Sequence, residues 1–521
     1  MTDRSPQPST FVGSVDSGGE HFPPGNWLDP CLIGVLAAII SLAGAGRPSF
    51  WYDEAATVSA SYSRSLPQLW QMLGNVDAVE GAYYLLMHGW FDVFPPTEFW
   101  SRAPSGLAVG GTAAGVVVLS KFFVSRNAAI ASGVVCAILP RTTWAGIEAR
   151  PYALSMMAAV WLTMLLVYAA QHEKAWAWVY YGTVLALSAL LDVYVLLLVV
   201  AHGLYICAFQ RRRTVLAGFA VTSGLAGCAV TPLLIAAVGQ AHQIGWISPV
   251  GYRTVEDVIV QQYFERSPPF ALLSLVVVVT TVALAVKGSV HVTRAARQLL
   301  TLAVAWFVIP TALIVGWSGL VHPIYTPRYL AFTAPALALV LGICVAALAS
   351  RPWAVAALLS MFTIAAAPNY VLAQRNSYAK YGMDYSQVAD LIGAKAAPGD
   401  CLLVNDTVTF MPAPMRPLLA ARPDAYRKLI DLTLWQRAID RNDVFDTNLI
   451  PEVVAKPLTR CGVVWIITQA DASLTAHQQG PALAPGPLFG ATPAFAVPHD
   501  LGFRLVERWQ FNLAQVIEAV R

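Results

Sequence analysis

Residues 32–54 read LIGVLAAIISLAGAGRPSFWYDE, an apolar run followed directly by the adjacent carboxylates Asp53 and Glu54. Two neighbouring carboxylates repel each other, and beside a membrane each also loses hydration. The repulsion and the lost hydration both raise the free energy of the folded protein, which suggests that the two carboxylates have a functional role. Because no basic segment precedes the apolar run, we interpret this run as an uncleaved first membrane helix and not as a signal peptide.

The composition is that of a polytopic membrane protein. Of the 521 residues, 57% are hydrophobic and 12% are charged, whereas soluble domains carry about 25% charged residues. A formal net charge of +3 is too small to indicate a nucleic-acid partner. Residues 1–27 are rich in Ser, Pro and Gly, which predicts a disordered cytoplasmic tail.

Apolar segments recur throughout residues 28–372, which we interpret as the transmembrane catalytic domain. A helix needs about 20 apolar residues to cross a bilayer. We expect about eleven transmembrane helices, at 30–46, 103–123, 127–140, 151–170, 175–191, 193–209, 214–238, 269–286, 299–318, 329–349 and 353–372. The shorter stretch 82–94 predicts an amphipathic helix at the membrane interface.

Charge orients these helices. With a cytoplasmic N-terminus, the inner loops are rich in Lys and Arg and hold a single acid, Glu173, while most acids fall in the outer loops. We therefore expect a multi-pass plasma-membrane protein whose residues 373–521 lie outside. The runs CLLVND, RCGVVWIIT and FRLVERWQF predict strands of a small extracytoplasmic α/β domain.

Two cysteines, Cys401 and Cys461, each open a predicted strand of this outer domain. An outer compartment permits disulfides, and adjacent parallel strands would bring the two openings together. A disulfide and a pair of buried thiols are both compatible with the sequence.

Polar residues gather at the predicted outer ends of the spans. They are Asp53, Glu54, Glu80, His88, Glu148, Arg150, Asp192, Tyr194, His322, Tyr325 and Arg328. Singly, an outer carboxylate is usually a solvated surface group, and a terminal Arg usually extends to the lipid headgroups. Asp192 is different, because its short turn holds it at membrane depth. Together, acids, arginines and tyrosines on one face suit an anionic lipid donor and a hydroxyl acceptor.

Four motifs follow the paired acids in a fixed order: AYYLLMHGW (82–90), SRAPSGLAVG (101–110), EARPYAL (148–154) and PRYLAF (327–332). In this order they resemble the GT-C superfamily of membrane glycosyltransferases, and most closely its protein O-mannosyltransferase and aminoarabinose-transferase branch. The resemblance covers residues 30–372. It implies transfer of a sugar from a polyprenyl-phosphate carrier to a hydroxyl of an envelope glycan or glycolipid, without a cofactor.

On the pattern of that superfamily, Asp53 is the catalytic base and Glu54 its neighbour. Arg328, Tyr325 and Arg150 bind the donor phosphate, and the cavity is lined by Glu80, His88, Glu148, Asp192, Tyr194 and His322. Many relatives carry His-Pro-Pro where this chain has Glu80 and Gly81, so its loop geometry and acceptor differ.

The sugar and the class of protein have alternatives. The Ala-, Val- and Arg-rich composition resembles actinobacterial proteins, where polyprenyl-phosphate mannose is a common donor; mannose is our first expectation and arabinose the second. A transporter or flippase of lipid-linked sugars would also be polytopic, but such proteins often show internal repeats, and none is visible here. No sequence motif indicates a metal.

Overall fold

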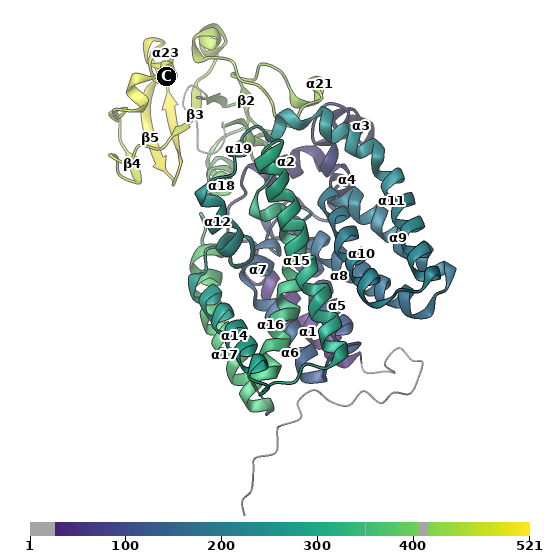
Figure 1. Cartoon of the computed structure of the whole chain (residues 1–521). Helices are drawn as coiled ribbons and strands as arrows, with labels where there is room; N and C mark the ends of the chain where they lie inside the picture. The colour runs from purple at the N-terminus through teal and green to yellow at the C-terminus, as the bar shows by residue number, and fades with distance from the viewer. Residues whose placement is uncertain (1–26, 350, 406–414) are drawn as a thin grey trace, which may run out of the picture. The chain divides into compact units, whose positions relative to one another are not determined.

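The computed structural model describes residues 27–349, 351–405 and 415–521, which form two compact units (Figure 1). The first unit comprises the chain up to Ala43 together with Arg102–Ala373, and the second comprises Gly44–Ser101 and Gln374–Arg521. The predicted tail lies outside the described residues, apart from Trp27. The segment Gly44–Ser101, predicted as the first outer loop, therefore groups with the C-terminal part of the chain and not with the long apolar helices.

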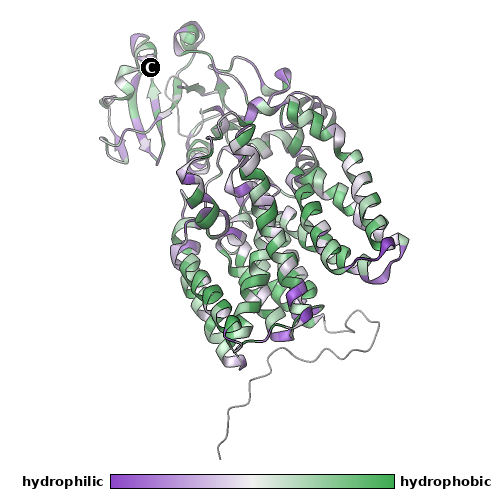
Figure 2. Cartoon of the chain, viewed as in Figure 1, coloured by the Kyte–Doolittle hydropathy of each residue, from purple (hydrophilic) through white to green (hydrophobic). Residues whose placement is uncertain are grey.

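The first unit is helical, and apolar side chains dominate its long helices (Figure 2). Among the described residues, seven helical segments are long and apolar enough to cross a membrane. They are Glu98–Lys121 (α5), Tyr152–His172 (α8), Arg213–Gly239 (α11), Pro268–Val286 (α14), Arg294–Leu320 (α15), Pro327–Leu348 (η5 and α16) and Pro352–Gln374 (α17 and η6). Shorter apolar helices are Leu28–Leu42 (α1), Arg126–Ile138 (α6), Ala175–Leu191 (α9) and Val193–Phe209 (η2 and α10). Each predicted span overlaps one of these helices, but only seven of the described segments are long enough to cross, so the expected number of about eleven crossings is not confirmed.

Small residues allow the helices of the first unit to pack closely. Helix α16 (Ala334–Leu348) lies against α6, and a Cβ atom added to Gly342 would come within 2.3 Å of the backbone nitrogen of Ser132. A Cβ atom on Gly110 of α5 would lie 2.8 Å from the carbonyl oxygen of Gly34 in α1. Such backbone approach at small residues stabilises helix association where lipid removes the hydrophobic driving force.

The second unit contains a six-stranded mixed sheet with the order β2-β1-β3-β6-β5-β4. Its strands are Cys401–Val404 (β1), Ile430–Asp431 (β2), Val463–Gln469 (β3), His477–Gln479 (β4), Arg504–Gln510 (β5) and Ala514–Val520 (β6). Strand β1 runs parallel to β2 and β3, while β6 is antiparallel to β3 and β5. The three predicted strands are β1, β3 and β5, so the expected small C-terminal sheet is confirmed.

A disulfide joins Cys401 and Cys461, whose Cα atoms are 6.1 Å apart. Cys401 begins β1, and Cys461 lies two residues before β3. Because β1 and β3 run parallel, both cysteines lie at the same end of the sheet. The structure thus selects the disulfide over the two buried thiols.

The helices of the second unit come from both ends of the chain. The loop contributes Tyr52–Ser61 (α2), Leu66–Leu73 (α3), Ala78–Glu80 (η1) and Gly81–Phe91 (α4). The C-terminal part contributes Tyr385–Lys395 (α18), Arg416–Ala421 (α19), Pro423–Tyr426 (α20), Ala438–Arg441 (α21), Pro451–Val454 (η7), Ala455–Leu458 (α22), Phe489–Ala491 (η8) and Pro493–Asp500 (α23). Helix α2 packs against α19.

Hydrogen bonds fasten the loop to the C-terminal part of the second unit. The Phe50 amide donates to Ser386 Oγ, and the Ser386 amide donates to Ser49 Oγ, both at 3.0 Å. At the far end of the loop, Arg422 Nη1 donates to both carboxylate oxygens of Glu98, at 2.7 and 2.8 Å. The segment that carries Asp53 is therefore an integral part of this unit.

Candidate active site

The paired acids occupy the first turn of α2, where Trp51 is the N-cap residue. Carboxylates there are stabilised by the positive end of the helix dipole, typically by about 0.3–1 kcal/mol. The two side chains differ in access, because Glu54 is fully buried while Asp53 is partly exposed. Of the two, Asp53 is the carboxylate that a substrate can reach.

Further carboxylates surround Tyr52, the residue before Asp53. The ring of Tyr52 contacts that of Phe445, with 5.0 Å between centroids. The pKa of Tyr52 is raised to about 12, mainly by burial and to a smaller extent by the negative charges of Asp53, Asp77 and Asp443. Asp443 comes from the C-terminal part of the chain and was not predicted, because it lies almost 400 residues from Asp53 in the sequence.

A second buried phenol belongs to α18. Tyr385 is fully buried, and burial followed by the charge of Asp384 raises its pKa, with Tyr52 and Asp53 contributing less. Asp53 is thus within electrostatic range of a tyrosine from each part of the second unit. A neutral phenol beside a carboxylate can donate hydrogen bonds at neutral pH but does not compete for its proton.

Two of the predicted cavity residues, Glu80 and His88, belong to the same unit as Asp53. Glu80 ends η1 directly before α4. His88 Nδ1 lies 2.8 Å from the carbonyl oxygen of Ser61, the last residue of α2. The contact shown for His88 therefore fixes α4 against α2.

The described residues contain no group of three or more His, Cys, Asp or Glu that could hold a metal ion. Among the carboxylates around Tyr52, Asp77 accepts a hydrogen bond from the hydroxyl of Tyr84 at 2.7 Å. Asp443 forms an ion pair with Arg441 at 3.0 Å. These two carboxylates are engaged by donors of the protein itself.

In the first unit, Arg328 lies on a platform of aromatic rings. Its guanidinium carbon is 5.1 Å from the ring centroid of Trp246 and 5.7 Å from that of Tyr329. Tyr194 stacks on Tyr329 with 5.6 Å between centroids, and its amide donates to Asp192 Oδ1 at 3.1 Å. The structure brings together the predicted Asp192, Tyr194 and Arg328, and adds Trp246, which sequence reasoning missed.

Tyr325 belongs to a buried polar network near this platform. Its hydroxyl donates to Gln262 Oε1 at 3.1 Å, and Arg141 Nε donates to the Gln262 carbonyl oxygen at 2.9 Å. Arg141 also forms an ion pair with Glu265. Burial raises the pKa of Tyr325, so the phenol stays protonated as a donor. Arg141 and Gln262 were not predicted, because neither stands in a recognisable motif.

Three further predicted residues of the first unit are Glu148, Arg150 and His322. Glu148 and Arg150 connect Pro140–Ala145 (α7) with α8 and are both buried. Ser105 Oγ donates to the Glu148 carbonyl oxygen at 2.6 Å. His322 is exposed, with its Nδ1 3.0 Å from the carbonyl oxygen of Pro323, a purely local contact.

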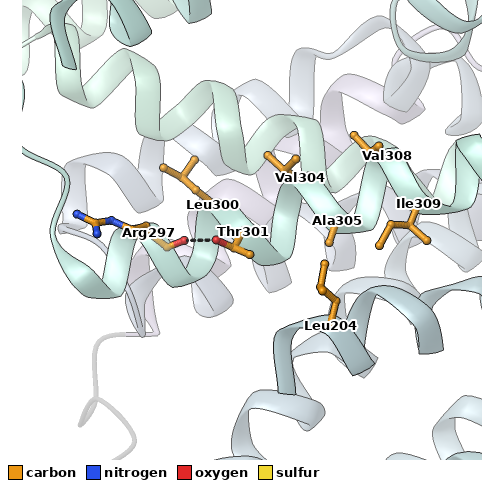
Figure 3. A pocket seen from close by; sticks show the side chains of 8 residues that line it. All are labelled: Leu204, Arg297, Leu300, Thr301, Val304, Ala305, Val308 and Ile309. Atoms are coloured by element: carbon orange, nitrogen blue, oxygen red, sulfur yellow. Dashed lines mark hydrogen bonds between the residues drawn. The ribbon is translucent and has the colours of Figure 1, made fainter. Parts of the chain in front are cut away.

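An apolar groove of about 440 Å³ lies between α10 (Leu198–Phe209) and α15 (Figure 3). Its lining residues are Leu204, Arg297, Leu300, Thr301, Val304, Ala305, Val308 and Ile309. Arg297 lies in the first turn of α15, while Arg328 follows the other end of this helix of 27 residues. The groove extends along α15 only as far as Ile309, and none of its lining residues is one of the predicted site residues.

No family model and no curated protein matches the sequence. Among solved structures, ArnT from Cupriavidus metallidurans in the apo state aligns with a TM-score of 0.56 at 13% identity, covering 94% of this chain and 97% of that chain. The same protein bound to undecaprenyl phosphate aligns over the same shares with a TM-score of 0.57 at 13% identity. This chain has the fold of ArnT.

An apo structure of the oligosaccharyltransferase from Archaeoglobus fulgidus also aligns, with a TM-score of 0.48 at 12% identity, over 86% of this chain and 70% of that chain. The match to ArnT extends over nearly the whole of both chains, including the part beyond residue 372. At 13% identity this agreement is one of fold alone.

Proposed function

We propose that this protein transfers a sugar, most simply mannose, from a polyprenyl-phosphate carrier to a hydroxyl of a glycan or glycolipid on the outer face of the plasma membrane. The observation that carries the proposal is Asp53, a partly exposed carboxylate in the first turn of α2, the helix that follows the first apolar helix of an ArnT-like fold. Support for the donor class comes from ArnT itself, whose structure holds undecaprenyl phosphate.

Asp53 acts as the general base in this proposal. It accepts the proton of the acceptor hydroxyl while the hydroxyl oxygen attacks the anomeric carbon, and the bond from that carbon to the phosphate oxygen breaks. The polyprenyl phosphate leaves with the bonding electrons, and the configuration at the anomeric carbon inverts. General-base catalysis of this kind contributes typically about 10²–10⁴-fold.

Arg328 and Arg150 bind the phosphate of the donor. A guanidinium forms charge-assisted, often bidentate hydrogen bonds with phosphate oxygens, and these strengthen as charge develops on the leaving group. The rings of Trp246 and Tyr329 restrict the guanidinium of Arg328 and so orient its donors. Asp192 and Tyr194, linked to this platform through Tyr329, shape the space for the sugar.

The Cys401–Cys461 disulfide supports placing the second unit outside the cytoplasm, because disulfides persist in oxidising compartments. The excess of Lys and Arg in the predicted inner loops supports the same orientation.

The test uses the full chain in lipid nanodiscs with decaprenyl-phosphate mannose and octyl α-mannoside, with decaprenyl-phosphate arabinose as a second donor. We expect a disaccharide product, detected by mass spectrometry, that disappears with the D53N variant. If the protein forms no product but, when reconstituted into closed vesicles, moves the lipid-linked sugar from one leaflet of the membrane to the other, it is a flippase. Absence of product with both donors would contradict the proposal.

A further inference from the structure

The second unit carries an open pocket of about 470 Å³ that the proposed mechanism does not use. It is lined by Leu434, Trp435, Gln436, Arg437, Asp440 and Arg441. Five of these side chains are exposed, and Trp435 is 60% exposed. An indole held open to water at the edge of a polar pocket is characteristic of a surface that receives a ligand.

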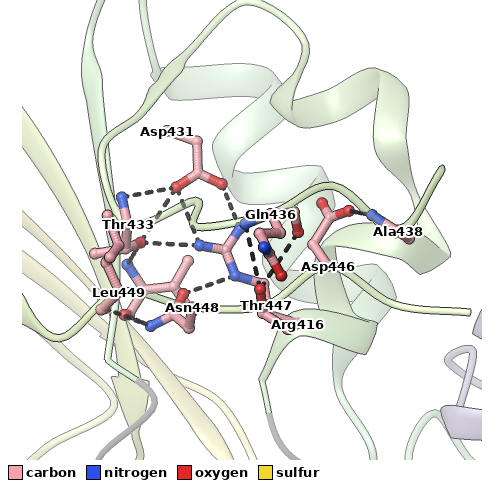
Figure 4. Close-up of polar contacts among 10 residues, drawn as sticks. Arg416, Asp431, Thr433, Gln436, Ala438, Asp446, Thr447, Asn448 and Leu449 are labelled. Atoms are coloured by element: carbon pink, nitrogen blue, oxygen red, sulfur yellow. Dashed lines mark hydrogen bonds and ion pairs between the residues drawn. The ribbon is translucent and has the colours of Figure 1, made fainter. Parts of the chain in front are cut away.

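The residues that line the pocket belong to the segment 434–448, which hydrogen bonds and an ion pair anchor to the rest of the unit (Figure 4). Arg416, only 3% exposed, donates to Asn448 Oδ1 at 2.7 Å and to Thr433 Oγ1 at 3.1 Å, and it also pairs with Asp431. These bonds fix the segment where it leaves β2 and where it returns. The lining side chains are therefore presented by backbone with little freedom, which lowers the entropic cost of binding.

Main-chain bonds across the segment complete this framework. The Trp435 amide donates to the Thr447 carbonyl oxygen at 3.0 Å, and the Gln436 amide donates to Thr447 Oγ1 at 3.2 Å. The Ala438 amide donates to Asp446 Oδ1 at 2.6 Å. Gln436 forms these bonds with its main chain, and its side-chain amide makes no hydrogen bond to other described residues. The two N–H donors and the carbonyl oxygen of that side chain can therefore bind a ligand.

The charges of the pocket are paired with each other. Arg437 forms two hydrogen bonds with the carboxylate of Asp440, at 2.9 and 3.1 Å. Arg441 pairs with Asp443 at 3.0 Å. Because Asp440 and Asp443 neutralise the two guanidinium groups, a phosphate or carboxylate gains little net electrostatic attraction here, whereas a neutral polyhydroxyl ligand can bond to both the remaining donors and the carboxylate lone pairs. The pocket therefore favours a neutral polar ligand over an anion.

A saccharide fits this set of groups. One face of a pyranose ring presents C–H groups, which pack on the indole of Trp435, and its hydroxyls suit the amide of Gln436 and the Arg437–Asp440 pair. Apolar contact with a few convergent polar groups is the general chemistry of small-ligand sites.

The same segment also holds the helix that carries Asp53. The Val444 carbonyl oxygen accepts from Ser59 Oγ at 2.5 Å, and the ring of Phe445 contacts Tyr52. Arg441 of the pocket is four residues before Phe445, a separation of at most about 14 Å between Cα atoms. A glycan seated at Trp435 would thus lie a few sugar residues or less from α2.

We infer that the pocket at Trp435 binds neutral sugar residues of a glycan acceptor, beyond the residue whose hydroxyl reacts. This inference deepens the proposed function, and it rests on that function only in naming the ligand an acceptor. The site would make longer acceptors bind more tightly and would leave the chemical step unchanged.

The test measures binding and transfer separately with the full chain in nanodiscs. Calorimetry without donor compares octyl mannoside with octyl tetramannoside, and a tetraarabinoside is run in parallel. We expect the wild-type protein to prefer one tetrasaccharide. Trp435→Ala should weaken that binding and raise the KM for the same acceptor about tenfold, with kcat and the donor KM unchanged. Trp435→Phe should retain most of the affinity. Ile450→Ala is the control, since Ile450 is 55% exposed in the same unit but does not line the pocket.

The outcomes separate the two proposals. The wild-type protein could bind a tetrasaccharide but transfer neither sugar, while Trp435→Ala loses that binding. This result would support the pocket and reject the proposed transferase activity. Transfer that is insensitive to Trp435→Ala, or a wild-type protein that binds neither tetrasaccharide, would overturn the pocket. An equal loss with the monosaccharide and tetrasaccharide acceptors would also overturn it, because the residue would then act at the reacting sugar.

Discussion

Replacement of Asp53 by Asn tests the assignment of the base. Asn keeps the shape of the side chain in the first turn of α2 but cannot accept the acceptor's proton. We expect kcat to fall by about 10²–10⁴-fold, a rise in barrier of about 2.7–5.4 kcal/mol at about 1.36 kcal/mol per tenfold. The lost interaction with the helix dipole costs only about 0.3–1 kcal/mol of stability, so catalysis should be lost from a folded protein.

The measurement is steady-state transfer from decaprenyl-phosphate mannose by purified variants in nanodiscs, with melting temperatures recorded on the same samples. Asp92→Asn is the matched control, because Asp92 is an exposed acid at the C-cap of α4 in the same unit. Its turnover should equal that of the wild type. D53N turnover within threefold of the wild type would refute Asp53 as the base, and a large drop in D53N melting temperature would assign it a structural role.

Three further changes probe other parts of the structure. Arg328→Ala should raise the donor Kd by about ten- to a hundredfold, because a charge-assisted hydrogen bond contributes about 1.5–3 kcal/mol. Arg328→Lys should recover little of the affinity, because the planar group that stacks on the rings is lost. Unchanged donor binding with weaker acceptor binding would instead assign Arg328 to the acceptor. The double variant Cys401→Ser and Cys461→Ser opens a loop with a sequence separation of 60 and should destabilise the second unit by about 4 kcal/mol, seen in calorimetric unfolding; equal stability with and without the bond would contradict this. Ser386→Ala leaves the buried Phe50 amide without its acceptor, at a cost of about 1–3 kcal/mol; kcat should fall with the donor KM unchanged, and an unaltered kcat would show that α2 does not need this anchor.

The sequence predicted the parts of the fold that depend on local composition. Each long apolar segment became a helix, because about 20 apolar residues in a row have few other ways to satisfy their backbone in lipid. Strands β1 and β3 are runs of mainly apolar residues, and β5 was predicted although four of its seven residues are charged or polar. Strands β2 and β4 were missed because they are only two and three residues long, and β6 was missed as well.

The candidate site was predicted where its residues stand in the ordered motifs, as Arg328 does in PRYLAF, beside the first apolar run, as Asp53 does, or in a short turn at membrane depth, as Asp192 does. Trp246 and Asp443 lie in loops, and Gln262 begins the three-residue helix Gln262–Phe264. Their contacts exist only in the folded chain. The grouping of the first outer loop with the C-terminal part depends on bonds such as Ser49–Ser386, between residues 337 positions apart, which no local pattern encodes.

That long-range bond has a consequence for biosynthesis. The loop carrying Asp53 is made early, but the serine that anchors it is added 337 residues later. At about 5–20 residues per second, the ribosome needs about 20–70 s to reach it. During this interval α2 has no C-terminal partner to hold it, so a nascent or prematurely terminated chain presents its carboxylates without the scaffold that orders them. The helix that carries Asp53 therefore gains its hydrogen-bonded anchor only after residue 386 has been synthesised.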